Sequence, residues 1–128
     1  MPKRYLFDTD VLIAYLRGYP QAVELLKALA AQRFDFFISP VTIIEIELGV
    51  WDAEKEKTYE FLDIFEVCTV DRSIAHLAGS SLKKYREKGV TLGFADVIIA
   101  ATAVTHHLTL VTYNISHYPM SELQIFHP

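Results

Sequence analysis

The segment YLFDTDVLIAYL (residues 5–16) joins a buried strand to a helix through two carboxylates. Residues 5–7 are apolar and typical of a core strand, and the apolar run resumes at residue 11. Asp8 and Asp10 interrupt that run. Buried carboxylates are costly unless they are paired, hydrogen-bonded or holding a metal ion. The segment therefore predicts a strand whose end carries function, with Asp8 at the centre of it.

The rest of the chain alternates strand patterns with helix patterns, which is typical of an α/β fold. Expected strands cover residues 4–7, 35–39, 65–70, 108–113 and 123–126, and expected helices cover 11–17, 20–32, 40–50, 52–62, 71–88 and 94–107. Asp10, Asp52 and Asp71 stand where they would cap three of these helices, and Gly89 where it would end one. The chain is therefore expected to form a single α/β domain over residues 1–128, with a mainly parallel sheet of four to five strands.

The composition narrows the class of protein. Of 128 residues, 52% are hydrophobic and 22% charged, which favours a globular chain over a disordered one. The net charge of −4 argues against coating nucleic acid by charge alone, but it allows an enzyme that meets phosphates through bound cations. The basic segment 83–88 fits a solvated helix end better than a polyanion site. One cysteine, Cys68, permits neither an intrachain disulfide nor a zinc framework, and is expected to be a buried strand residue.

No segment is typical of export or of the membrane. The opening residues lack the three regions of a signal peptide. The longest run of low charge, residues 89–105, contains Asp96 and fits a buried helix better than a membrane span. We therefore expect a cytoplasmic protein without a membrane partner.

Further polar residues stand where the local pattern is apolar. Glu45 and Glu47 share one helix, and because they are two residues apart only one can face a common site. Asp96 is the one formally charged residue between positions 88 and 106. Thr112 and Asn114 follow a predicted strand directly. In a parallel sheet, side chains beyond the carboxyl ends of the strands can converge.

Each of these residues also has an ordinary structural explanation. Asp10 fits a helix cap, Glu45 an exposed helix position and Asp96 a helix start, while Asn114 fits a turn and His117 the surface. Taken together the acids favour a cation, because clustered carboxylates repel one another unless an ion lies among them. Oxygen ligands select Mg²⁺ or Mn²⁺, which orient phosphate oxygens and activate water in phosphodiester cleavage. Nucleophile-elbow and glycine-rich phosphate-loop motifs are absent.

The order and spacing of these segments resemble the PIN-domain ribonucleases, in particular VapC-type toxins of toxin–antitoxin pairs. The similar segments are FDTDVLIAYLRG (7–18), ISPVTIIEIELG (38–49) and GVTLGFADVIIAATAVTHHLTLVTYN (89–114). The resemblance covers nearly the whole chain, and it implies a three-layer α/β/α PIN-like domain.

The resemblance also implies a role for each matching position. Asp8, Glu45 and Asp96 match the three metal-binding carboxylates; Glu45 is chosen over Glu47 because it lies four residues before a helix glycine. Asn114 matches the fourth position, where the family often has Asp, and Thr112 a supporting hydroxyl. Asp10 matches a variable position and is given a supporting role. Related chains with Asn at the fourth position commonly carry another acid shortly after it, where this chain has Ile115, Ser116 and His117.

By this resemblance the chain would be a Mg²⁺- or Mn²⁺-dependent endoribonuclease that hydrolyses RNA. Its partners would be RNA, a VapB-like antitoxin whose tail blocks the site, and a second copy in a homodimer. The apolar helices over 11–32 and 41–62 are candidate faces for the two protein partners. The alternative is a PIN-like module that binds RNA or protein without cutting. A haloacid-dehalogenase phosphatase, which also opens with two acids, fits poorly because no Lys or Arg follows residue 96.

Overall fold

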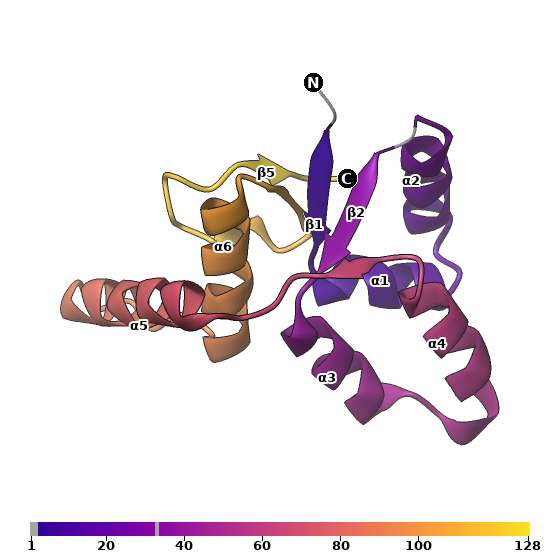
Figure 1. Cartoon of the computed structure of the whole chain (residues 1–128), viewed down its shortest axis with the longest axis horizontal. Coiled ribbons are helices and arrows are strands. Elements are labelled where there is room, and N and C mark those ends of the chain that lie inside the picture. Colours follow the sequence, from indigo (N-terminus) through magenta and orange to yellow (C-terminus); the bar gives the residue numbers. More distant parts are fainter. Residues whose placement is uncertain (1–2, 33) are drawn as a thin grey trace.

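The computed structural model describes residues 3–32 and 34–128. Within them, one sheet of five parallel strands is covered by six α-helices (Figure 1). The strands are β1 (Arg4–Phe7), β2 (Asp35–Ile38), β3 (Glu66–Val67), β4 (Thr109–Val111) and β5 (Ile125–Phe126). The helices are α1 (Thr9–Leu16), α2 (Pro20–Ala31), α3 (Pro40–Gly49), α4 (Lys55–Leu62), α5 (Arg72–Glu87) and α6 (Phe94–His106), with short 3₁₀ turns η1 (Asp52–Glu54) and η2 (Ile115–His117). None of these helices is long and apolar enough to cross a membrane.

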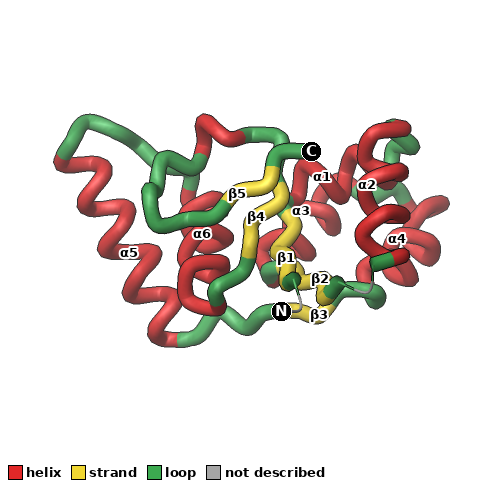
Figure 2. Tube along the Cα trace, turned by 90° about the horizontal axis from the view of Figure 1, so that it is seen from above, coloured by secondary structure: helices red, strands yellow, loops and turns green. Residues whose placement is uncertain are grey.

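Helices cover both faces of the sheet, which confirms the three-layer α/β/α architecture. Seen from above, α5 and α6 lie on one side of the strands and α1, α2 and α4 on the other (Figure 2). Side chains alternate along each strand. Leu6 and Leu110 belong to the core shared with α5 and α6, whereas Phe7 and Val111 belong to the core shared with α1 to α4. The sheet is therefore buried on both faces, as expected for parallel strands.

The strand order places the end of β1 beside the end of β4. The sheet runs β3-β2-β1-β4-β5, so the chain builds outward from β1 on one side and then returns to its other side. Phe7 is in register with Val111, and the Asp8 amide donates to the Val111 carbonyl at 2.9 Å. Asp8 and Thr112 therefore leave the sheet side by side. Ligands of open α/β sheets bind at such a reversal of strand order.

Two predicted helix caps are wrong. Asp8, not Asp10, occupies the N-cap position of α1, and Asp10 lies in the first turn with its carboxylate accepting from the Tyr113 amide. Asp52 is the first residue of η1, and its carboxylate pairs with the Lys55 ammonium at 3.1 Å. The cap at Asp71 is confirmed, because its carboxylate accepts from the Ile74 amide at 2.9 Å. A hydrogen bond from the distant Tyr113 amide occupies Asp10, and an ion pair with Lys55 occupies Asp52, so neither carboxylate caps its predicted helix.

The third strand is shorter than predicted. β3 covers two of the six residues expected, and both are exposed because β3 is the edge of the sheet. Cys68 lies just beyond it and is half-buried rather than buried in a strand, although its amide still donates to the Ile38 carbonyl at 2.9 Å. The apolar pattern of residues 65–70 therefore reflects the packing of the loop after β3 as well as the pairing of β3.

Candidate functional site

Asp8 is a buried carboxylate held by three donors. Only 4% of the residue is exposed. One carboxylate oxygen accepts from the Thr9 amide at 2.8 Å, and the other accepts from the hydroxyls of Thr112 and Tyr118, each at 2.8 Å. Burial raises the pKa of the Asp8 carboxyl above its ordinary value, and these hydrogen bonds offset part of that rise. The hydrogen bonds thus favour the ionised form against the larger effect of burial.

Tyr118 connects Asp8 to Asp96. Its hydroxyl oxygen lies 2.8 Å from Asp8 Oδ2 and 3.3 Å from Asp96 Oδ1, and the residue is 3% exposed. One hydroxyl has one proton, so the closer carboxylate receives it. Burial, together with the charges of the two carboxylates, raises the pKa of Tyr118, which therefore stays a neutral donor. A neutral hydroxyl lies between two acids that would otherwise face each other.

Asp96 enters the site from the start of α6. It is the third residue of that helix, where the helix dipole favours a carboxylate. Its other oxygen, Oδ2, lies 3.4 Å from His117 Nδ1. The residue before the helix, Gly93, comes so close that a Cβ there would lie 2.6 Å from the same oxygen. The turn before α6 and the loop after β4 therefore fix this carboxylate together.

Asp10 and Thr112 join α1 to the end of β4. Asp10 Oδ2 accepts from the Tyr113 amide at 3.0 Å, whereas its buried Oδ1 has no hydrogen-bond partner among the described residues. Burial and the charge of Asp8 raise the pKa of Asp10 to about 6. Thr112 is fully buried and also accepts from the Asn114 amide at 3.0 Å. Asp10 therefore links α1 to the loop after β4 through one carboxylate oxygen and leaves the other without a hydrogen bond among the described residues.

Glu45 reaches the site through Thr9. The Thr9 hydroxyl donates to Glu45 Oε1 at 2.7 Å and lies 3.0 Å from the hydroxyl of Thr42. Since Thr9 also donates its amide to Asp8, one residue links the two acids. Glu47 points elsewhere, where its carboxylate accepts from the Tyr59 hydroxyl at 2.8 Å. The expected divergence of the two glutamates is confirmed.

Asn114 is at the rim of this group. It is exposed, and its contact with the other site residues runs through its backbone, which donates to Thr112. Its carbonyl accepts from the His117 amide at 3.0 Å, which closes the short η2 turn. The Asn114 side chain is thus near the acids in sequence and topology but makes no hydrogen bond with them in the described part of the chain.

The donor set suits a hard divalent cation. Asp8 follows β1, whereas Glu45 and Asp96 lie in α3 and α6, and all three offer oxygen atoms alone, as Mg²⁺ and Mn²⁺ prefer. Over residues 3–32 and 34–128, no three acidic, histidine or cysteine side chains converge closely enough to enclose an ion. Hydroxyls of Thr9 and Tyr118 separate the acids instead. The oxygen chemistry of the site therefore fits the ion, and holding the ion would require the acids to approach one another.

Comparison with known proteins assigns the fold and the order of these residues to one family. The PIN domain pattern matches residues 5–121. The chain belongs to the PIN-domain family. Ribonuclease VapC10 of Mycobacterium tuberculosis is 38% identical over 117 residues, which are 91% of this chain and 87% of that protein.

Solved structures of the same family agree with the fold. The VapBC2 structure from Rickettsia felis, bound to a promoter DNA fragment, has a TM-score of 0.84 at 22% identity and covers 97% of this chain and 98% of its own. The DNA-bound VapBC structure from Salmonella typhimurium has a TM-score of 0.80 at 26% identity, with coverage of 99% and 98%. The fold therefore matches these structures over nearly all of the chain.

Sequence reasoning missed two residues of this PIN-domain site. Tyr118 lies between two acids, yet it reads as one more aromatic residue in a loop. Thr9 reads as a spacer between Asp8 and Asp10. Thr9 had a detectable signal, since a third polar residue in the buried turn requires a partner. Tyr118 had none, because its position depends on how the last loop folds back.

Proposed function

We propose that this PIN-domain chain is a metal-dependent endoribonuclease, the toxin of a VapBC-type toxin–antitoxin pair. The observation that carries the proposal is the approach of Asp8, Glu45 and Asp96 from three separate elements to the point where the strand order reverses. The identity with a ribonuclease of the VapC group supports the reaction, and the VapBC structures support a protein partner.

In this proposal Asp8, Glu45 and Asp96 hold Mg²⁺ or Mn²⁺, with Asn114 completing the ligands. When bound, such an ion activates water and neutralises charge on the phosphodiester. Asp10 and Thr112 have supporting roles: Thr112 orients Asp8 by hydrogen bonding, and Asp10 anchors the backbone that precedes Asn114. These contacts hold Asp8 and the start of the loop after β4 in fixed positions.

The proposed partners follow from the same reading. RNA is the substrate, and an antitoxin of the VapB type occupies the site when the toxin is inhibited. The protein acts in the cytoplasm as a homodimer. Exposed apolar side chains on α3, with Leu48 84% and Ile44 60% exposed, supply a face for the second copy.

Cleavage of end-labelled RNA by the purified chain, free of any partner, tests the proposal. Reactions contain Mg²⁺, Mn²⁺ or EDTA, and Asp96→Asn is compared with Asp63→Asn, which changes an exposed acid outside the site. Metal-dependent cutting that Asp96→Asn abolishes and Asp63→Asn retains is the expected result. A folded chain that neither cuts RNA nor binds either metal would favour the non-cleaving binding module instead.

A further inference from the structure

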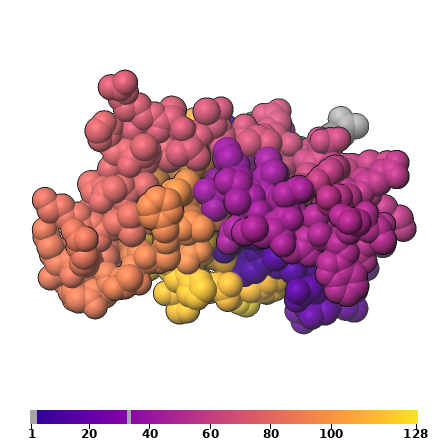
Figure 3. All heavy atoms as spheres, turned by 90° about the horizontal axis from the view of Figure 1, so that it is seen from below, coloured from indigo at the N-terminus to yellow at the C-terminus, as the bar shows by residue number. Residues whose placement is uncertain are grey.

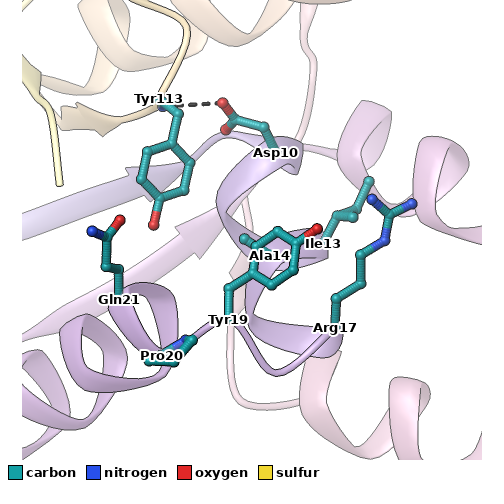
Figure 4. A pocket seen from close by; sticks show the side chains of 8 residues that line it. All are labelled: Asp10, Ile13, Ala14, Arg17, Tyr19, Pro20, Gln21 and Tyr113. Carbon is teal, nitrogen blue, oxygen red and sulfur yellow. Dashed lines mark hydrogen bonds between the residues drawn. The ribbon is translucent and has the colours of Figure 1, made fainter.

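A hollow of about 850 Å³ lies beside the acidic site, between α1, the start of α2 and the loop after β4 (Figure 4). Apolar side chains of α1 line it from one side. Tyr113 points from the loop toward Gln21 and Tyr19, which come from the start of α2. Arg17, at the end of α1, lines the opposite part of the hollow. Two aromatic rings, a cation and an amide thus face one space.

Backbone contacts fix both tyrosines. Gly18 has a φ of 76°, and its amide donates to Tyr15 while the Tyr19 amide donates to Ala14 at 3.0 Å. These two bonds form a Schellman motif that ends α1 and sets the position of Tyr19. On the other wall, Asp10 holds the Tyr113 amide at 3.0 Å. The two rings are therefore attached to rigid backbone, although 54% of Tyr19 is exposed.

The polar groups around the hollow are uncommitted. In the described part of the chain, the hydroxyls of Tyr19 and Tyr113, the Gln21 amide and the Arg17 guanidinium take part in no hydrogen bond or ion pair. A hollow lined by aromatic and apolar side chains with a few polar groups at its edge is typical of a ligand site.

The hollow adjoins the acidic site, because residues that contact Asp8 are next in sequence to residues that line the hollow. Thr112, which precedes Tyr113, donates to Asp8, and Asp10 both lines the hollow and holds Tyr113. A strand of RNA with a phosphate at the carboxylates therefore carries a neighbouring base to this hollow. Single-stranded RNA is recognised in this way, by stacking of splayed bases on aromatic side chains and by contacts with base edges.

We propose that this hollow is a nucleobase subsite that takes one base of single-stranded RNA beside the scissile phosphate. The base stacks on Tyr19 and Tyr113, Gln21 contacts its edge, and Arg17 pairs with a flanking phosphate. This assignment rests on the proposed nuclease function. A polypeptide is the competing occupant. A nucleotide fits the lining better, because the aromatic rings suit its base, the amide suits the edge of that base and the cation suits a phosphate.

Binding to RNA that lacks one base tests the subsite. The protein carries Asp96→Asn to prevent cutting, and short fluorescent single-stranded RNAs of mixed sequence carry an abasic ribose at one position at a time. Affinity is measured by fluorescence anisotropy in Mg²⁺. We expect about a tenfold loss at one position, and we expect Tyr19→Ala to cause a similar loss with intact RNA. The two losses should not add, because they remove the same stacking contact.

Two further variants make the result specific. Tyr19→Phe keeps the ring and should retain affinity and the abasic pattern. Tyr59→Ala removes another exposed tyrosine, 41% exposed, from α4 and should change neither. Additive losses for Tyr19→Ala at every RNA position would overturn the subsite and leave a polypeptide as its occupant. Metal-dependent cutting by the unmodified chain without this coupling would overturn the subsite alone, whereas coupling without cutting would refute the nuclease and retain the base site.

Discussion

At Asp8, burial and hydrogen bonding have opposite effects on a single carboxyl group. Its burial raises the pKa of the carboxyl, and Asp96 adds repulsion, while Thr112, Tyr118 and Thr9 donate hydrogen bonds that lower it again. Burial is the larger effect, so without a cation the ionised side chain costs stability at neutral pH. A residue that costs stability where a neutral one would fit is expected at a functional site rather than in a scaffold.

Replacing this carboxylate should therefore stabilise the metal-free protein. We expect Asp8→Asn to raise the free energy of unfolding by about 1 kcal/mol, because it removes charge and keeps most of the shape. Urea unfolding in EDTA measures the change, and RNA cleavage should be lost in the same variant. A large fall in stability would mean that the hydrogen bonds to Asp8 outweigh its burial.

Asp10 makes stability depend on pH. Its pKa is about 6 in the folded chain against an ordinary value of 3.8, so the folded state binds more protons between these two values. Stability from this group is complete below about pH 4 and is lost as pH rises through about 6. Melting temperatures in EDTA should show this fall, and Asp10→Asn should flatten it. A variant that follows the unmodified curve across this window would contradict the assignment.

At the scale of elements, the turn before α6 is coupled to the site. A Cβ on Gly93 would lie 2.6 Å from Asp96 Oδ2, the flexible end of a side chain. The carboxylate can turn away at small cost, but it then leaves Tyr118 and His117. The backbone of Gly93, with a φ of −64°, accepts any residue.

Gly93→Ala should therefore lower activity more than stability. We expect RNA cleavage to fall at least about tenfold, since a displaced catalytic group loses its alignment, with a change of less than about 1 kcal/mol in the free energy of unfolding. Gly79→Ala in α5 is the matched control, because a Cβ there meets nothing within 4 Å. Equal cleavage by the two variants would show that the turn does not position Asp96.

The elements also show how far sequence alone could reach. Apolar periodicity predicted every helix of the core and the strands β1, β2 and β4, since these bury side chains on a regular repeat. Apolar periodicity did not predict the role of a polar side chain where one hydrogen-bond partner determines that role. Asp10 was expected to cap α1, but its carboxylate accepts from the distant Tyr113 amide instead. Tyr118 could not be placed at all, because the loop that carries it has no repeat.

The whole molecule has an apolar surface that the single chain leaves uncovered. Ile44 and Leu48 lie one turn apart on α3, Trp51 follows, and α3 contacts the start of α6, where Phe94 is 73% exposed. The purple α3 and the orange start of α6 lie side by side in Figure 3. Leu48, Trp51 at 76% and Phe94 are the three most exposed large hydrophobic side chains in the described part of the chain. Exposed apolar side chains gathered on neighbouring elements favour association.

Leu48→Glu tests whether this surface joins two copies. The side chain is 84% exposed, so the substitution should leave the free energy of unfolding of each chain within about 0.5 kcal/mol. In a homodimer, however, it places two unpaired charges in an apolar contact, which disfavours association by several kcal/mol, on the order of the cost of burying an unpaired charge. Light scattering should give a dimer for the unmodified chain and a monomer for Leu48→Glu, while Val90→Glu, at a position 41% exposed outside α3, should remain dimeric. A monomeric unmodified chain, or a Leu48→Glu variant that still dimerises, would assign this surface to a different partner and leave the acidic site to work in a single copy.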